Sequence, residues 1–111
     1  MTDPRTSSLA ALLDDIEREL RHLGSWSGQP PPQSAFASTM PFFADQMEFD
    51  TWLQWVLVAR FRALIEGALP LPERCQIAPM AEESLKHIEQ DTRDLIELLH
   101  QLDALFADPA L

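Results

Sequence analysis

Hydrophobic residues recur at spacings of three and four along four stretches of the chain, which is the pattern of one face of an α-helix. These stretches cover residues 7–23, 51–66, 79–89 and 92–107. The strict alternation that is typical of a half-buried β-strand is not evident. We therefore predict an all-α fold, a small four-helix array that is antiparallel in part. We expect a single domain over residues 1–111, with residues 1–6 flexible.

Residues with special backbone or capping properties mark the expected helix ends. Gly24 suits the left-handed position after the first helix, and Gly67 ends the second. Asp50 and Asp91 are the expected N-caps of the second and fourth helices, because a short polar side chain can accept a free backbone N–H. Pro79 is tolerated in the first turn of the third helix, where its missing N–H leaves no bond unmade.

The second helix is apolar nearly all round. At a step of ~100° per residue, two arcs of its surface are apolar. One arc holds Trp52, Trp55, Ala59 and Ala63, and the other holds Leu53, Leu57, Phe61 and Leu64. Such a helix is normally surrounded by other helices, so we expect it at the centre of the fold, with the first and fourth helices packed on it.

A long connection, residues 25–49, joins the first two helices. Its first half contains three consecutive prolines and favours polyproline-like backbone. Its second half is rich in large apolar residues: Phe36, Met40, Phe42, Phe43 and Met47. That content argues against disorder, so we expect the segment to pack along the bundle with a helical turn near residues 42–46.

The aromatic residues of this connection and of the second helix have two interpretations. The relevant residues are Phe36, Met40, Phe42, Phe43, Trp52 and Trp55. In the first, they complete the core of a small bundle. In the second, part of the set lines a groove for a partner peptide or an apolar ligand.

Charge excludes some classes of partner. The chain has 18 Asp and Glu against 8 Lys and Arg, which gives a net charge of −10. Binding to nucleic-acid phosphates or to anionic membranes relies on clustered cations, so we expect neither. The acidic residues after residue 79 form either a solvated face or a surface for a basic protein. No apolar run approaches ~20 residues and no signal peptide is evident, so we expect a cytoplasmic protein.

Few residues are arranged for catalysis or for metal binding. Glu19 with His22, and Glu97 with His100, have a spacing used in di-iron bundles, but each histidine falls outside the apolar stripe of its helix. Cys75 is the single cysteine and is interpreted as a structural thiol. We therefore expect no catalytic residue, no cofactor and no metal site.

Arg60 is the one charged residue on an apolar arc of the second helix. A guanidinium there is costly unless its head reaches water or meets a carboxylate. Asp45 or Glu48 is the expected partner, which would tie the connection to the helix. The alternative is an anion-binding arginine in a cleft with Trp52 and Trp55.

Several runs of residues resemble a known family. They are Thr39-Met40-Pro41-Phe42-Phe43, Trp52-Leu53-Gln54-Trp55-Val56-Leu57, Leu69-Pro70-Leu71-Pro72, Ile77-Ala78-Pro79 and Leu102-Asp103-Ala104-Leu105-Phe106-Ala107. With these runs the chain, from Leu9 onward, resembles the YqcC-like family of small bacterial proteins. Met80 is a departure, because some members carry an aromatic residue after the Ala-Pro pair.

The resemblance implies a compact all-helical domain of unknown activity. The family's gene often neighbours that of tRNA pseudouridine synthase C, and the family is sometimes labelled with that name. Such an enzyme needs a catalytic Asp in a large mixed fold and a basic RNA surface, so the label does not imply that activity here. A link to tRNA modification would act through protein contact.

Three hypotheses for function follow. The leading one is a non-enzymatic interaction module that uses residues 36–55 or the acidic C-terminal helices, with a tRNA pseudouridine synthase as the partner. The second is a small-ligand-binding protein with a cleft near Arg60, Trp52 and Trp55. The third is an unrecognised enzyme, which alkylation of Cys75 or metal analysis of the purified protein would test. Self-association as a homodimer through the aromatic region is a further alternative.

Overall fold

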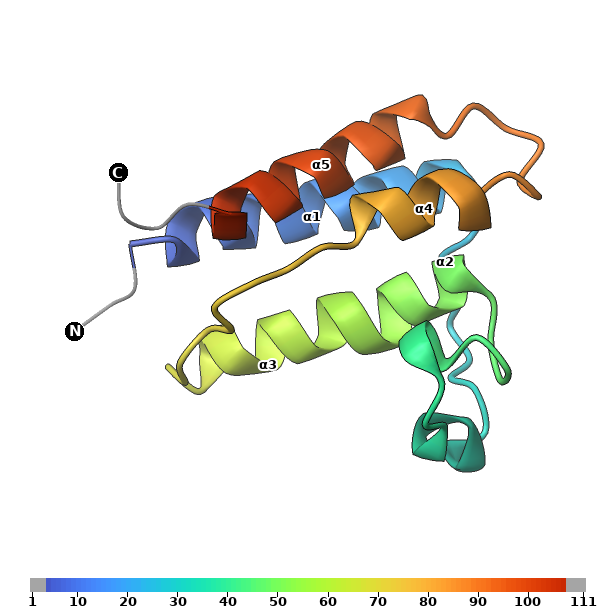
Figure 1. The fold of residues 1–111 in the computed structure, drawn as a ribbon, viewed down its shortest axis with the longest axis horizontal. Helices are drawn as coiled ribbons and strands as arrows, with labels where there is room; N and C mark the ends of the chain where they lie inside the picture. The colour runs from blue at the N-terminus through green and yellow to red at the C-terminus, as the bar shows by residue number, and fades with distance from the viewer. Residues whose placement is uncertain (1–3, 108–111) are drawn as a thin grey trace.

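The computed structural model describes residues 4–107, and within that range its regular elements are all helical. The elements are α1 (Thr6–His22), the 3₁₀ turns η1 (Gln33–Ala37) and η2 (Pro41–Phe43), α2 (Phe49–Trp52), the π-turn η3 (Leu53–Val58), α3 (Ala59–Glu66), α4 (Ala78–Ser84) and α5 (Arg93–Ala107). Because α2, η3 and α3 follow one another without a break, they form one rod, residues 49–66 (Figure 1). The predicted four-helix array is therefore confirmed.

The helices α1 and α5 form the upper layer of the molecule, where they lie side by side and antiparallel (Figure 1). Their apolar stripes face the core and are fully buried. The stripes consist of Leu9, Leu13, Ile16 and Leu20 on α1, and Leu95, Leu99, Leu102 and Phe106 on α5. Burial of each such side chain stabilises the fold by roughly 1.5–3 kcal/mol, so this seam dominates the core.

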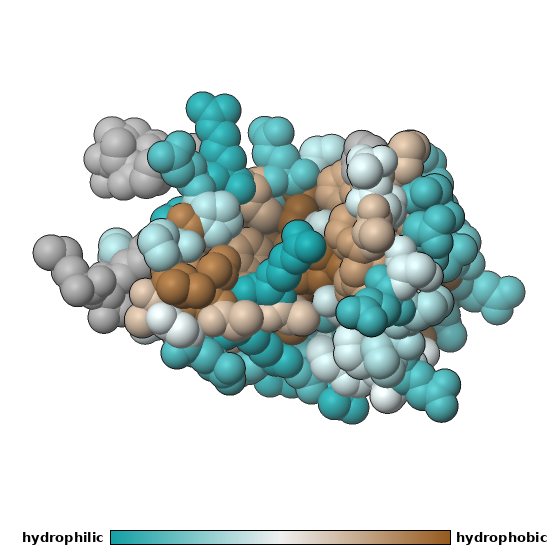
Figure 2. All heavy atoms as spheres, turned by 90° about the horizontal axis from the view of Figure 1, so that it is seen from below, coloured by the Kyte–Doolittle hydropathy of each residue, from teal (hydrophilic) through white to brown (hydrophobic). Residues whose placement is uncertain are grey.

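The rod forms a second layer beneath α1 and α4 (Figure 1). Its inner side buries Leu53, Leu57 and Phe61 against the upper layer, whereas Ala59 and Ala63 are exposed. The prediction that other helices surround the rod on all sides is therefore wrong. No helix of the described range covers the outer side of α3. Figure 2 shows the molecule from below, where hydrophobic residues lie on either side of a hydrophilic side chain that crosses the middle of the face.

The connection gathers around the N-terminal end of the rod and does not run along it (Figure 1). The expectation that it packs along the bundle is wrong, and the reason is local. Two 3₁₀ turns, η1 and η2, fold the segment back on itself. The helical turn predicted near residues 42–46 is confirmed, because the backbone N–H of Met47 donates to the carbonyl of Phe43 at 3.0 Å.

A buried amide pins the start of this connection to the rod. Gln54 lies in the π-turn and is only 5% exposed. Its Oε1 accepts the backbone N–H of Ser27 at 2.8 Å, and its Nε2 donates to the Ser27 carbonyl at 2.6 Å. Both polar atoms of a buried side chain are thereby satisfied, which offsets the cost of removing them from water.

One of the predicted helix ends needs correction. Gly24 adopts a φ of +76° after α1, as predicted. Gly67 directly follows the last residue of α3, as predicted; its φ of −84° is right-handed, and the left-handed residue is Ala68 with a φ of 52°. Asp50 lies inside α2, which Glu48 precedes, so Asp50 is not the N-cap of the second helix.

The third and fourth helices depend on two aspartates at their starts. The Asp103 carboxylate, from α5, accepts the backbone N–H groups of Ile77 at 2.8 Å and Ala78 at 2.9 Å, and so caps α4 from another helix. Asp91 accepts the N–H of Arg93 at the start of α5, in line with its predicted capping role. The third helix is shorter than predicted. It ends at Ser84, whose carbonyl oxygen lies 2.7 Å from the Nδ1 atom of His87.

The described range begins at Pro4, and residues 1–3 of the predicted flexible segment lie outside it. Thr6 already belongs to α1, and Arg5 donates to the carbonyl of Pro72 at 3.1 Å. None of the described helices combines the length and the apolar character that crossing a membrane requires.

An ion-pair network joins α1 to the rod. Arg62 lies 2.7 Å from Glu17 and 3.1 Å from Asp14, and Arg21 also bonds to Glu17 at 2.9 Å. The hydrogen bond from Arg21, followed by the bond and charge of Arg62, lowers the pKa of Glu17. Ionised Glu17 therefore stabilises the contact between the two layers.

The variant Glu17→Gln tests this network through pH. A lowered pKa in the folded state gives stability that is present at neutral pH and is lost as pH falls through that pKa. We expect wild type to exceed Glu17→Gln in free energy of unfolding by about 1 kcal/mol or less near pH 7, with the gap closing below about pH 4. Urea titrations at several pH values measure it. A difference in stability that does not change with pH would contradict this role of the Glu17 charge.

Candidate functional site

The aromatic residues predicted as a candidate site separate into an inner and an outer group. In the inner group, the ring centroids of Phe42 and Trp52 are 4.9 Å apart, and both rings contact Phe49. Phe42 and Trp52 are half-buried and pack against the hydrophobic core. These two residues therefore complete the core at the N-terminal end of the rod.

The outer group lies closer to solvent. Phe36 and Phe43 meet edge to face with centroids 6.4 Å apart, and the guanidinium of Arg60 lies 5.7 Å from the centre of the Phe43 ring. Met40, which directly precedes η2, is 50% exposed. The structure thus brings Phe36, Phe43 and Arg60 together and leaves Met40 at the surface.

The predicted tie between Arg60 and the connection exists, but its partner is an aromatic ring. Asp45 bonds to the hydroxyl of Ser38, which lowers the pKa of Asp45, while Glu48 faces His87 at 3.9 Å. Among the described residues neither carboxylate pairs with Arg60, so the expected carboxylate partner is wrong. An exposed arginine over a ring gains about 0.5–1 kcal/mol from the ring quadrupole.

Two consecutive phenylalanines hold strained backbone between these groups. Phe42 and Phe43 have φ values of 57° and 52°, in the left-handed region that bulky residues rarely adopt. The conformation sends Phe42 toward the core and Phe43 toward Phe36. Residues in such regions cost about 1–3 kcal/mol each, and the surrounding contacts must supply that energy.

Trp55 is half-buried on the rod, and its indole Nε1 is fully buried. No acceptor for this N–H is found within residues 4–107. Gln54, its neighbour, was not predicted to matter, although a lone amide between apolar residues is a signal for a buried hydrogen bond. The two neighbours therefore differ: the Gln54 side chain hydrogen-bonds to Ser27, whereas the Trp55 N–H has no acceptor among the described residues.

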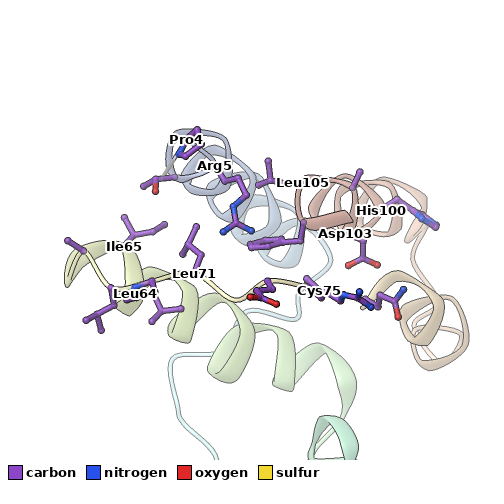
Figure 3. Close-up of a pocket in the computed structure, with 18 of the residues that line it drawn as sticks. Pro4, Arg5, Leu64, Ile65, Leu71, Cys75, His100, Asp103 and Leu105 are labelled. Atoms are coloured by element: carbon purple, nitrogen blue, oxygen red, sulfur yellow. The ribbon is translucent and has the colours of Figure 1, made fainter. Parts of the chain in front are cut away.

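A large open groove lies away from all these residues, between the start of α1, the end of α3, residues 68–76 and α5 (Figure 3). Its volume is about 1750 Å³. Leu64, Ile65 and Leu71 line it from one side and Leu105 from the other. Arg5 also lines the groove, with its guanidinium 4.7 Å from the centre of the Phe106 ring. Periodicity alone gave no reason to expect this groove.

Cys75 lines this groove but is not arranged as a nucleophile. Burial, together with the charge and hydrogen bond of Asp103, raises the pKa of the Cys75 thiol to about 12. A thiolate is the reactive form, so the thiol is almost wholly protonated at neutral pH. Its interpretation as a structural thiol agrees with this geometry.

A second, smaller hollow separates residues 42–49 from α4 and has a volume of about 530 Å³. We call it the notch, and its lining includes Phe42, Asp45, Met47, Glu48, Met80 and Ser84. Neither the groove nor the notch is lined by Arg60, Trp52 or Trp55. The cleft expected near those three residues therefore stays a prediction.

The histidines occupy the surface of the molecule. His22 and His100 are both exposed, and His100 lies 3.0 Å from Glu82 of α4. Within the described part of the chain, no three side chains of His, Cys, Asp or Glu are grouped so that they could hold a metal ion.

Comparison with known proteins gives a consistent set of relatives. A family model, DUF446, described as tRNA pseudouridine synthase C, matches residues 8–105. The uncharacterised protein YqcC of Escherichia coli strain K12 is 40% identical over 98 residues, which cover 88% of this chain and 90% of that protein. An uncharacterised protein of Haemophilus influenzae is 37% identical over 93 residues, 84% of each chain.

A third relative is much longer. The tRNA pseudouridine synthase C of Pectobacterium carotovorum is 44% identical over 68 residues, which cover 61% of this chain but only 18% of that protein. The solution NMR structure of Escherichia coli YqcC superposes with a TM-score of 0.81 at 37% identity, covering 100% of this chain and 93% of the other. The solved structure confirms the all-helical fold.

Replacement of Arg60 tests its contact with Phe43. Arg60→Met keeps the apolar stem and removes the charge, so we expect a melting temperature lower by about 2–6 °C. We also expect faster proteolysis within residues 33–47. Arg18→Met is the control, because Arg18 is exposed and pairs only with Asp15 of its own helix. Unchanged melting and proteolysis in Arg60→Met would contradict the tie.

Alkylation tests the state of Cys75. With a pKa of about 12, its thiolate fraction near pH 8 is about a thousandfold below that of an ordinary thiol. We therefore expect iodoacetamide to label the folded protein about a thousandfold more slowly than the protein unfolded in guanidinium chloride. Equal rates, followed by mass spectrometry, would show an activated or open thiol.

Proposed function

The chain belongs to the YqcC-like family, and from that premise we propose that it is a non-enzymatic accessory module that binds a tRNA pseudouridine synthase through protein contact. The proposal rests on the match to the Pectobacterium protein of that name, in which the segment similar to this chain makes up only 18% of the length. A related helical segment thus shares one polypeptide with a much longer sequence. Segments joined in one chain in one organism are candidates for association as separate chains in another.

The charges of the chain favour protein contact over RNA contact. The net charge is −10, whereas RNA binding requires cations to neutralise phosphates. Most cations of residues 4–107 also have a carboxylate within 4 Å. They are Arg18, Arg21, Arg62, Lys86 and Arg93. An acidic surface instead suits a partner whose own surface is basic, as an RNA-binding enzyme needs to be.

The surface also carries apolar features of the kind that bind proteins. Met40, Leu69 and Met80 are large hydrophobic residues that are at least 38% exposed. Met40 belongs to the aromatic connection, Leu69 lines the groove and Met80 lines the notch. Exposed apolar residues beside hollows are typical of interaction surfaces.

A small-ligand-binding protein is the second candidate function. The observation that favours it is the buried Trp55 N–H, which has no acceptor among the described residues. A ligand carbonyl or carboxylate that entered beside Trp55 would satisfy this donor, with Arg60 on the same rod. Quenching or a shift of tryptophan fluorescence on addition of a ligand, abolished by Trp55→Phe, would favour this candidate.

Copurification tests the leading proposal. The tRNA pseudouridine synthase of the source organism, tagged and coexpressed with this chain, should retain it through size-exclusion chromatography. Because the complex joins surfaces of opposite charge, its association rate should fall as salt rises. Unmodified tRNA alone should not bind the chain. A chain that never comigrates with the synthase, or that binds tRNA directly, would overturn the proposal.

A further inference from the structure

We propose that the notch receives a basic amphipathic segment of the partner, an inference that rests on the proposed function and assigns its contact surface. Residues 44–49 form one wall of the notch, and Met80 and Ser84 of α4 form the other. The start of α2 and the end of α4 meet at this end of the molecule (Figure 1).

The notch is an open hollow that can receive side chains of a docking segment. Its volume of about 530 Å³ lies within the roughly 300–1,000 Å³ of ligand sites, and it is open to solvent. Phe42 and Phe49 line its apolar part from one wall, with Met47 beside them and Met80 opposite. Methionine side chains are flexible and polarisable, so two of them adapt to an incoming apolar residue.

The charge around the notch selects a basic occupant. Asp45 and Glu48 line it, and the hydrogen bond from Ser38 lowers the pKa of Asp45, which keeps that carboxylate ionised. Asp50 lies beside Glu48, since both carboxylates are 3.9 Å from the Nε2 of His87. The nearby ammonium of Lys86 already pairs with Glu83 at 3.0 Å. An apolar residue flanked by Lys or Arg meets both the methionines and the carboxylates.

The larger groove does not make the same selection. Its charged lining mixes signs, because it includes Arg5 and Arg74 as well as Glu73 and Asp103. Such a lining favours neither a cationic nor an anionic partner. The lining of the notch combines apolar side chains with carboxylates and contains no Lys or Arg. Charge complementarity therefore favours a basic, partly apolar segment as its occupant.

Ring contacts and a hydrogen-bonded turn help to hold the notch in a formed state. The left-handed φ values of Phe42 and Phe43 turn the chain so that Phe42 contacts Phe49 and Trp52 behind the notch. The turn is closed by hydrogen bonds from the N–H groups of Gln46 and Met47 to the Phe43 carbonyl, at 2.9 and 3.0 Å. A wall fixed before binding loses less conformational entropy when the partner arrives.

Two substitutions and two matched controls test the assignment. Met80→Lys places a cation inside the notch, and Leu69→Lys makes the same change at an exposed leucine of the groove. Glu48→Lys reverses a charge at the notch, and Glu97→Lys reverses an exposed charge on α5. All four positions are exposed, and circular dichroism confirms that each variant folds.

Binding is measured to two probes at physiological salt. The first is the tRNA pseudouridine synthase, and the second is a fluorescein-labelled helical peptide with leucines on one face and lysines on the other. We expect Met80→Lys and Glu48→Lys each to raise the dissociation constants for both probes by about tenfold or more. Leu69→Lys and Glu97→Lys should change them by about twofold or less.

The outcomes separate the two proposals. If the synthase binds all four variants as it binds wild type, the notch assignment is overturned and the proposed function stands. If the synthase does not bind but the peptide discriminates the notch variants from their controls, the proposed function fails and the notch stands. Equal weakening by Glu48→Lys and Glu97→Lys in both assays means that only the total charge acts, which overturns the notch. If neither probe binds wild type, both proposals are overturned.

Discussion

Gln54 is the buried polar side chain of the described range, and its amide oxygen and nitrogen both hydrogen-bond to the backbone of Ser27. That position fixes where the connection leaves α1 and reaches the rod. The three prolines that follow are stiff and lack N–H donors, so the chain can fold back only after them, in η1 and η2. The location of the aromatic groups and of the notch therefore depends on one amide inside an otherwise apolar helix.

Helical periodicity was sufficient for the elements whose environment is simple. The predicted ends of α1 and α5 lie within one residue of those observed, because each helix has one apolar stripe and one buried face. The rod was harder, for two physical reasons. Its π-turn changes the angular step, so a projection at ~100° per residue drifts beyond Leu53. Ala59 and Ala63 are also small enough to be left in solvent at little cost, so an apolar arc did not mean a covered one.

The candidate site was predictable in its members and not in its contacts. The richness of residues 36–55 in aromatic side chains was visible in the sequence, and so was the oddity of Arg60. Residue spacing, however, does not predict two consecutive phenylalanines with positive φ. This turn places the Phe43 ring near Arg60, where a carboxylate was expected. Asp103 reached its backbone partners from 25 residues away, a contact that only the tertiary fold can create.

The cap that Asp103 places on α4 fixes the position of this short helix between the groove and the notch. One end of α4 is bonded to α5 at the edge of the groove, and Met80 and Ser84 of the same helix form a wall of the notch. Seven helical residues span only about 10 Å, so α4 brings the two hollows close to one another. Because Asp103 fixes the first turn of α4, the carboxylate that lines the groove also determines where one wall of the notch lies.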